Sequence, residues 1–204
     1  MSEEMKPEEQ RPEEEQKPEQ PGRGLYEWAQ ALVCSVLAAV VLFAFAVRVV
    51  GVSGGSMRNT LQNGDLLLVV NSLLCGDYQR GDVVIAAKDS FEHGEPIVKR
   101  VIATEGQTVD VDFDGGVVYV DGAALEEPYI LEATHLSEGI VFPLTVPEGC
   151  VFLMGDNRNG SRDSRDPELG AVDTRCLIGR AVFLLLPGET EELGVREWNR
   201  IGKL

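Results

Sequence analysis

The chain has 204 residues, of which 44% are hydrophobic and only 6% aromatic, and its formal net charge is -16 at pH 7. This length suits one moderate domain with appendages. The acidic balance argues against nucleic-acid binding, which normally requires a basic surface that faces the phosphate backbone.

Residues 1–24 form a separate compositional zone. Eight Glu, four Lys or Arg and four Pro are crowded there in a loose repeat of a basic residue, proline and glutamate. Such a segment has too few apolar side chains to bury a core, so we expect a disordered, extended acidic tail. An interaction tail is the alternative, because blocks of charge also serve that purpose.

A transmembrane helix is predicted over residues 25–48. The 20 residues from Trp28 to Val47 carry no charge, and a helix of that length spans about 30 Å, the thickness of a bilayer core. Tyr26 stands near one end, as interfacial aromatics often do, and Arg48 closes the other. The alternatives are a buried core helix, for which the stretch is long, and a cleavable signal peptide, which an acidic preceding region disfavours.

Short β-rich runs separated by Gly, Asp and Pro follow the apolar segment and predict a mainly β fold, a sandwich or a barrel-like domain. A hairpin turn is predicted at residues 114–116, Asp-Gly-Gly. We expect a main β core over 49–103 and 149–190, a smaller β subdomain inserted at 104–148, and a loosely packed C-terminal tail at 191–204. Seven runs have the composition of strands: residues 65–70, 82–86, 97–102, 108–112, 117–120, 150–154 and 180–185.

Four cysteines occur, at positions 34, 75, 150 and 176. No short Cys-Cys or Cys-His spacing indicates a metal site, and we expect neither a metal nor a cofactor. We favour the interpretation that the cysteines are small buried hydrophobic residues. A single disulfide is the alternative if the β domain is extracytoplasmic.

Ser56 and Lys99 are the candidate catalytic pair. Ser56 follows a glycine-rich approach, and Lys99 lies within the apolar run of residues 96–103. A serine hydroxyl becomes a useful nucleophile when a neighbouring base takes its proton. Lysine can be that base where burial disfavours the ammonium form and lowers the pKa from its ordinary value of about 10.4.

The alternation of a strand supplies that environment for Lys99. Along the run, Lys99 shares one face with Ile97 and Val101, whereas its charged neighbour Arg100 points to the other face. Alone, each residue of the pair is more typical of a turn serine or of a strand lysine that extends its amine to water.

A third motif, residues 154–165, is dense in small and hydrogen-bonding side chains: Met-Gly-Asp-Asn-Arg-Asn-Gly-Ser-Arg-Asp-Ser-Arg. Following a strand, it predicts a structured loop held by bonds from side chains to the backbone. On composition alone, a polar surface loop is an equal alternative.

Together these pieces resemble bacterial type I signal peptidases of the single-span type, membrane-bound serine endopeptidases that remove signal peptides from exported proteins. The resemblance covers the apolar span and nearly all of residues 48–186. Five blocks match in the family's order, which makes the match specific: Ser56-Met57 with Thr60-Leu61, Gly64-Asp65, residues 81–84, residues 99–101 and residues 155–165.

The resemblance implies that Ser56 is the nucleophile and Lys99 the general base of a Ser/Lys dyad. It implies that Ser161 orients the lysine amine by a hydrogen bond. Two charge pairs are expected to maintain the shape of the polar loop, namely Asp163 with Arg165 and Arg100 with Asp156.

Substrate binding is expected by β-augmentation, in which an extended signal peptide pairs with edge strands near the dyad. Cleavage after small residues, Ala-X-Ala, would follow from pockets that exclude larger side chains by clash. The backbone N–H of Ser56 is one expected oxyanion donor, and Gly54 stands where some members carry a second donor. The substrate-binding positions implied by the resemblance are Val52, Gly54, Met57, Leu61, Ile97 and Val98.

One departure from the family pattern lies close to the nucleophile. The family usually has proline where this chain has Asn59. Because proline fixes φ, we expect a looser turn around Ser56 in this chain.

The resemblance also implies partners and a location. The partners are signal peptides of exported preproteins, membrane lipid and the secretion translocon, and no nucleic acid. The location is the cell membrane, with a single pass, the N-terminus in the cytoplasm and the β domain outside. Charge does not decide this orientation, because Arg23 and Arg48 flank opposite ends of the span.

Three other functions compete with this one. One is a catalytically impaired, membrane-anchored β binding or scaffold module, and the departure from the family pattern at Asn59 supports this alternative. A Ser-His-Asp protease would need His93 or His135 beside Ser56. The self-cleaving repressors also use a Ser/Lys pair, but they are soluble and bind DNA, which the apolar span and the acidic charge disfavour.

Overall fold

The computed structural model describes residues 23–190 and 194–204 of the chain. The predicted acidic tail therefore lies outside the described residues, apart from Arg23 and Gly24. These two residues belong to the first helix, which differs from the predicted boundary.

Helix α1 spans Arg23–Phe45 and, by length and composition, is able to cross a membrane. Its side chains from residue 24 to residue 45 are exposed, which argues against the alternative of a core helix. The helix ends earlier than predicted, because strand β1, Val47–Gly51, begins two residues after it. Strand β1 pairs with β2 from Val47, opposite Val70, so sheet pairing of valines outweighs continuation of the helix here.

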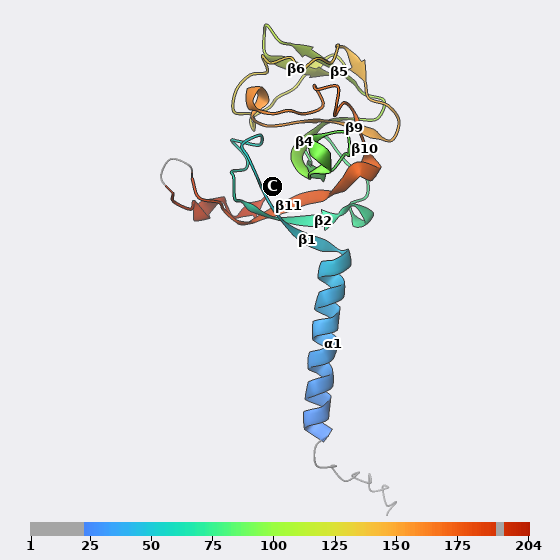
Figure 1. The fold of residues 1–204 in the computed structure, drawn as a ribbon, viewed down its shortest axis with the longest axis vertical. Helices are drawn as coiled ribbons and strands as arrows, with labels where there is room; N and C mark the ends of the chain where they lie inside the picture. The colour runs from blue at the N-terminus through green and yellow to red at the C-terminus, as the bar shows by residue number, and fades with distance from the viewer. Residues whose placement is uncertain (1–22, 191–193) are drawn as a thin grey trace, which may run out of the picture. The chain divides into compact units, whose positions relative to one another are not determined.

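Within the described residues, twelve strands form two antiparallel sheets, so the prediction of a mainly β chain is confirmed. The larger sheet has the order β1-β2-β11-β3-β4-β9-β10, with β12 paired to β11. Figure 1 labels β1, β2, β11, β4, β9 and β10 of this sheet. Its strands are β1 as above, β2 Leu66–Asn71, β3 Val83–Ala86, β4 Ile97–Thr104, β9 Cys150–Met154, β10 Val172–Asp173, β11 Leu177–Leu186 and β12 Gly202–Lys203.

The smaller sheet lies within residues 104–148 and has the order β7-β6-β5-β8. Its strands are β5 Thr108–Asp112, β6 Val117–Val120, β7 Ala123–Ala124 and β8 Leu144–Thr145. Single turns of 3-10 helix occur in the connections: η1 Ser72–Leu74, η2 Glu92–Gly94, η3 Arg158–Gly160, η4 Thr174–Cys176 and η5 Trp198–Arg200.

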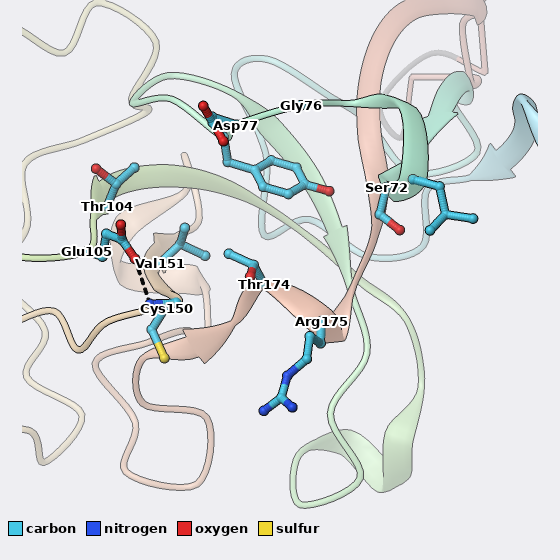
Figure 2. Close-up of a pocket in the computed structure, with 12 residues that line it drawn as sticks. Ser72, Gly76, Asp77, Thr104, Glu105, Cys150, Val151, Thr174 and Arg175 are labelled. Carbon is cyan, nitrogen blue, oxygen red and sulfur yellow. Dashed lines mark hydrogen bonds between the residues drawn. The ribbon is translucent and has the colours of Figure 1, made fainter.

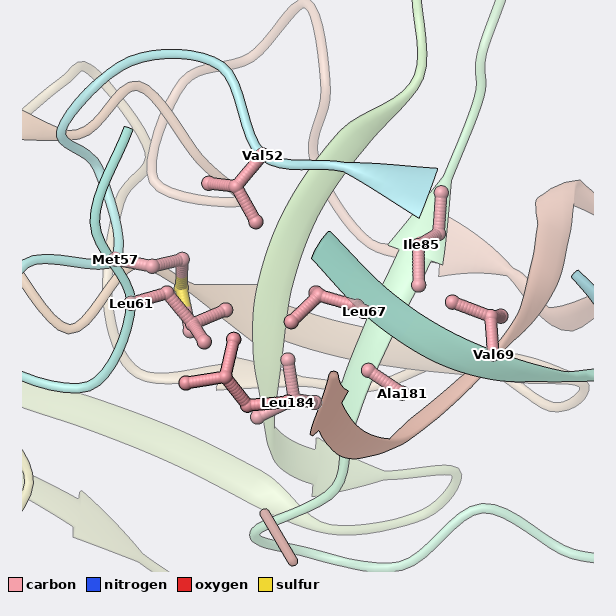
Figure 3. Packing of buried hydrophobic residues seen from close by; sticks show 9 residues of the cluster. Val52, Met57, Leu61, Leu67, Val69, Ile85, Ala181 and Leu184 are labelled. Atoms are coloured by element: carbon pink, nitrogen blue, oxygen red, sulfur yellow. The ribbon is translucent and has the colours of Figure 1, made fainter. Parts of the chain in front are cut away.

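The apolar side chains form three buried clusters. The first includes Leu67 and Leu184 and extends to the segment around Ser56; Figure 3 shows Val52, Met57 and Leu61 of that segment pointing into it. The second lies around Leu153 and the third around Phe152, so neighbouring residues of β9 pack into different clusters, as strand alternation requires.

The end of the chain is joined to the fold, contrary to the expected loose tail. Strand β12 pairs with β11, and the guanidinium of Arg200 lies 2.6 Å from Oδ2 of Asp65. Asp65 is fully buried and also accepts hydrogen bonds from the backbone N–H groups of Gln62 and Gly188. A buried carboxylate needs such partners, and the C-terminal segment supplies the cationic one.

Candidate active site

A chain of tight turns carries Ser56 between β1 and β2. Gly54 has a φ of +84°, a left-handed conformation that a side chain would disfavour. The N–H of Thr60 donates to the carbonyl of Met57 at 3.1 Å, which closes the next turn. The buried side chain of Met57 anchors these turns to the first apolar cluster.

Lys99, on β4, contacts Ser56. Its Nζ lies 2.8 Å from Ser56 Oγ and 3.2 Å from the carbonyl oxygen of Val98. The residue is 4% exposed, as strand alternation predicted, so the amine is almost shielded from solvent. The two predicted members of the pair are therefore within hydrogen-bonding distance.

The electrostatics of Lys99 favour its neutral form. Burial is the largest cause, and it lowers the pKa of the amine below its ordinary value. The carboxylates of Asp163, Glu138 and Glu92 act in the opposite direction, and the guanidinium of Arg165 adds to the lowering. Desolvation outweighs the carboxylates, so the pKa moves down.

Asn157, for which no role was predicted, holds the backbone at Gly55 and Ser56. Its N–H donates to the carbonyl of Ser56 at 3.0 Å, and its Nδ2 donates to the carbonyl of Gly55 at 3.0 Å. The sequence shows that Asn157 lies inside the polar motif. Its position among eleven other residues does not indicate which backbone groups its amide binds.

Asp163 connects the polar loop into one structure. One of its carboxylate oxygens accepts from the backbone N–H of Gly155 and from Ser161 Oγ, each at 3.0 Å. The carboxylate also binds the guanidinium of Arg165 through two hydrogen bonds of 2.8 Å. Both members of this ion pair are fully buried.

Arg100 forms the second charge pair, and its side chain is mostly buried as well. Its guanidinium binds the carboxylate of Asp156 at 2.9 Å and 2.7 Å and donates to the carbonyl of Gly81. The hydroxyl of Thr60 also donates to Asp156. The ring of Tyr129 lies 4.1 Å from the guanidinium carbon, a cation–π contact from the inserted segment.

The inserted segment contributes to the loop in two more places. Glu127 binds the guanidinium of Arg158, which is fully buried, at 2.6 Å and 2.8 Å. Glu138 accepts from the backbone N–H of Asp163 at 3.1 Å. These carboxylates are distant in sequence from the polar motif, and no pattern in the chain marked them.

Ser161 lies in the site, with its hydroxyl bonded to the neighbouring Asp163. Among the hydrogen bonds of the described residues, Ser161 Oγ donates to Asp163 and not to Lys99. A methyl group added at Gly155 would lie 2.3 Å from Ser161 Oγ and 2.5 Å from the carbonyl oxygen of Ser56. Gly155 therefore lets the polar loop approach Ser56 closely.

Gly155→Ala is expected to reduce turnover on the order of 100-fold, because the new methyl group must displace the backbone of Ser56 or the side chain of Ser161. Turnover of a peptide substrate by the full-length chain is the measurement. Gly202→Ala is the matched control, since nothing lies within 4 Å of a side chain there. Equal turnover of both variants would contradict the close approach.

The six predicted substrate-binding positions have different environments. Val52, Met57 and Leu61 are 6%, 1% and 0% exposed, so their side chains belong to the packed core shown in Figure 3. Gly54 is exposed, and its N–H donates to the side chain of Asn63 at 3.1 Å. Two half-buried positions, Ile97 and Val98, pack against different clusters, on opposite faces of β4.

The other candidate groups are not assembled around Ser56. The ring of His135 is exposed, with Nδ1 2.9 Å from the carbonyl oxygen of Phe113, and His93 lies in η2. The four cysteines are free thiols. Cys34 is exposed and the three beyond α1 are partly buried, whereas small buried side chains were expected.

A pocket of about 500 Å³ lies between η1 and the start of β9, and neither Ser56 nor Lys99 lines it. Figure 2 shows its wall, where Glu105 accepts the backbone N–H of Gly149 at 2.7 Å. None of its lining residues is a predicted site residue.

Comparison with known proteins identifies the chain. A family model described as signal peptidase, peptidase S26, matches residues 25–186. Signal peptidase I of Bacillus licheniformis is 36% identical over 171 residues, which are 80% of this chain and 89% of that protein. Signal peptidase I of Bacillus amyloliquefaciens is 34% identical over 188 residues, 88% of this chain and 95% of that protein.

A crystal structure of a signal peptidase I from Enterococcus faecalis V583 is 30% identical in sequence, with a TM-score of 0.42, covering 52% of this chain and 97% of that one. From the family model and the relatives, the chain belongs to peptidase family S26, the signal peptidases. It is a serine peptidase of the signal peptidase I type, and it cleaves signal peptides from the preproteins that carry them.

Proposed function

We propose that the chain cleaves signal peptides with Ser56 as the nucleophile and Lys99 as the general base. The observation that carries this proposal is the 2.8 Å contact between Lys99 Nζ and Ser56 Oγ, made by an amine that is 4% exposed. A neutral amine at that distance can accept the hydroxyl proton as the oxygen attacks a carbonyl.

The reaction follows acyl-transfer logic. Ser56 Oγ attacks the scissile carbonyl carbon, and its proton passes to Lys99 Nζ. The amine of the mature protein leaves with that proton, and an ester to Ser56 remains. Lys99, neutral again, takes a proton from water, whose oxygen attacks the ester carbonyl carbon. The bond from that carbon to Ser56 Oγ then breaks, the signal peptide leaves as the acid, and Ser56 Oγ takes the proton back from Lys99. Within residues 23–190 and 194–204 the N–H of Ser56 donates to no acceptor, which supports its use for the oxyanion.

Substrate binding by strand addition is supported by the strand edges near the dyad. The pairing of β4 with β9 begins at Arg100, opposite Met154, whereas residues 97–99 of β4 pair with β3 alone. Strand β1 is at the end of the sheet order. An extended peptide between these edges would bring its carbonyl to Ser56, and cleavage after Ala-X-Ala follows if the half-buried Ile97 and Val98 exclude larger side chains.

Ser161 and the two charge pairs support the dyad in this proposal. The hydroxyl of Ser161 donates to Asp163, so its oxygen keeps lone pairs that can accept a hydrogen bond from Lys99. The pairs of Asp163 with Arg165 and Arg100 with Asp156 fix the loop behind the nucleophile.

Ser56→Ala is expected to lower turnover by at least about 10⁴-fold, since removal of a nucleophile leaves only binding and electrostatic stabilisation. The measurement is cleavage, by the full-length chain in detergent micelles, of a peptide with Ala-X-Ala before the cut. Ser72→Ala is the control serine, and a peptide with Leu for either Ala tests the specificity. Cleavage by the Ser56→Ala variant would remove this serine from the mechanism.

The rate should rise with pH through the lowered pKa of Lys99. Below that pKa the amine is protonated and cannot accept the serine proton, so kcat/KM falls tenfold per pH unit there. At higher pH the amine is free, and the rate reaches a plateau. A pH–rate profile that is flat from about pH 5 to about pH 9 would contradict a lysine base.

In the same proposal, α1 anchors the chain once across the cell membrane, with the N-terminus in the cytoplasm and the β domain outside. There the enzyme would meet lipid and the translocon that delivers preproteins. The apolar length of α1 supports an anchor, and protease digestion of intact cells tests its direction. A β domain that resists digestion until the membrane is opened would reverse the orientation.

A further inference from the structure

The turn after the nucleophile contains a left-handed residue that is not glycine. Asn59 has a φ of +87°, and it is the third residue of the turn that Met57 and Thr60 close by their 3.1 Å hydrogen bond. A type II turn requires a positive φ at this place and accepts Gly or Asn there. Proline is excluded, because its ring holds φ near about -65°.

The side chain of Asn59 joins this turn to the inserted segment. Its Nδ2 lies 3.3 Å from the carbonyl oxygens of both Tyr129 and Ile130. The next residue, Leu131, donates its N–H to the carbonyl of Asp156 at 2.9 Å. The amide of Asn59 therefore reaches a segment that is itself attached to the polar loop.

The nucleophile is thus held from two sides. On one side Asn157 binds the carbonyls of Gly55 and Ser56. On the other side the turn that follows Ser56 is fixed by the backbone of Asn59, by its amide, and by the bond of Thr60 to Asp156. A shift of that turn would move Ser56 Oγ relative to Lys99 Nζ.

We propose that Asn59 is a positioning residue for Ser56, through its left-handed backbone first and its carboxamide second. The inference rests on the proposed roles of Ser56 and Lys99. The backbone contributes more, because the side chain is exposed and both of its hydrogen bonds are long, at 3.3 Å.

The test compares four variants of the full-length chain, with kcat and KM measured on the Ala-X-Ala peptide. Asn59→Gly keeps the backbone and is expected to retain kcat within about threefold. Asn59→Asp keeps the shape but cannot donate, with a loss of about threefold. Asn59→Ala is expected to lose about tenfold, because the left-handed conformation disfavours a β-carbon. Asn59→Pro is expected to lose at least about 30-fold, and KM should stay within about twofold throughout.

Asp121→Ala is the matched control. Asp121 also has a positive φ, +53°, and its carboxylate accepts from the N–H of Thr108, but it lies in the turn between β6 and β7 of the smaller sheet. This variant should lower the thermal midpoint and leave kcat unchanged, which separates a loss of stability from a loss of positioning.

A wild-type kcat in Asn59→Pro would overturn the role of Asn59. If the proline variant does not fold, an equal kcat in Asn59→Gly and Asn59→Ala would overturn that role instead. Either result, with Ser56→Ala still inactive, leaves the nucleophile assignment intact. Retained cleavage by Ser56→Ala would overturn both proposals.

Discussion

Lys99→Met is expected to abolish cleavage and, at the same time, to raise the thermal stability of the chain. The variant removes the proposed base, whose amine lies 2.8 Å from Ser56 Oγ, so turnover should fall by at least about 10³-fold. Methionine fills a similar volume without an amine that must be desolvated, so the fold should gain on the order of 1 kcal/mol. Turnover and thermal unfolding of the full-length chain are measured in parallel.

The pH dependence of this stability gain tests separately whether folding lowers the pKa of Lys99. The folded-state pKa of Lys99 is lowered by burial, whereas the unfolded chain keeps the ordinary value. Between those two values the unfolded state binds one more proton than the folded state, so wild-type stability rises with pH. The advantage of the methionine variant should therefore shrink as pH rises towards about 10.4. An advantage that grows with pH would contradict a buried, neutral amine.

Asp163→Asn is expected to have the largest effect on stability. Asp163 and Arg165 are both fully buried, and removal of the charge leaves the guanidinium without its closest counter-charge. Breaking such a pair costs about 3–5 kcal/mol. Glu138, 4.0 Å from the same guanidinium, compensates in part, so we expect about 3 kcal/mol and a thermal midpoint lower by about 6–12 °C.

The same variant should shift the pH–rate profile. The carboxylate of Asp163 raises the pKa of Lys99, so its loss lowers that pKa further and moves the acidic limb to lower pH. Asp173→Asn is the control, because it breaks an exposed pair with Arg175 and should leave both the profile and the midpoint unchanged. An unchanged profile in Asp163→Asn would show that this carboxylate does not act on Lys99.

The fold was predictable from sequence where strands are long and regularly patterned. All seven predicted strands are present, and the pattern around Lys99 correctly placed it in a dry environment. Strands of two residues, such as β10 and β12, were missed because so short a run carries no periodicity. Strand β1 was missed because the uncharged residues that lead up to Arg48 also fit the end of an apolar helix.

The site was predictable only where a residue type itself indicates chemistry. Ser56 and Lys99 have such types, but Asn157 and Thr60 act through the backbone and through a buried charge pair, which only the folded geometry reveals. Arg100 pairs with Asp156, the partner that the resemblance implied, and the burial of this pair is what the residue types did not indicate. The looser turn expected at Asn59 stays a prediction, but the φ of +87° found there is one that proline could not adopt.

The inserted segment limits how this enzyme can be recombined with its relatives. It delivers Glu127 to Arg158, the Tyr129 ring to Arg100 and Glu138 to the N–H of Asp163. A chimaera that received residues 105–148 from another signal peptidase would replace the partners of Arg158, Arg100 and Asp163 at the same time. An exchange between relatives should therefore move this segment together with the polar loop.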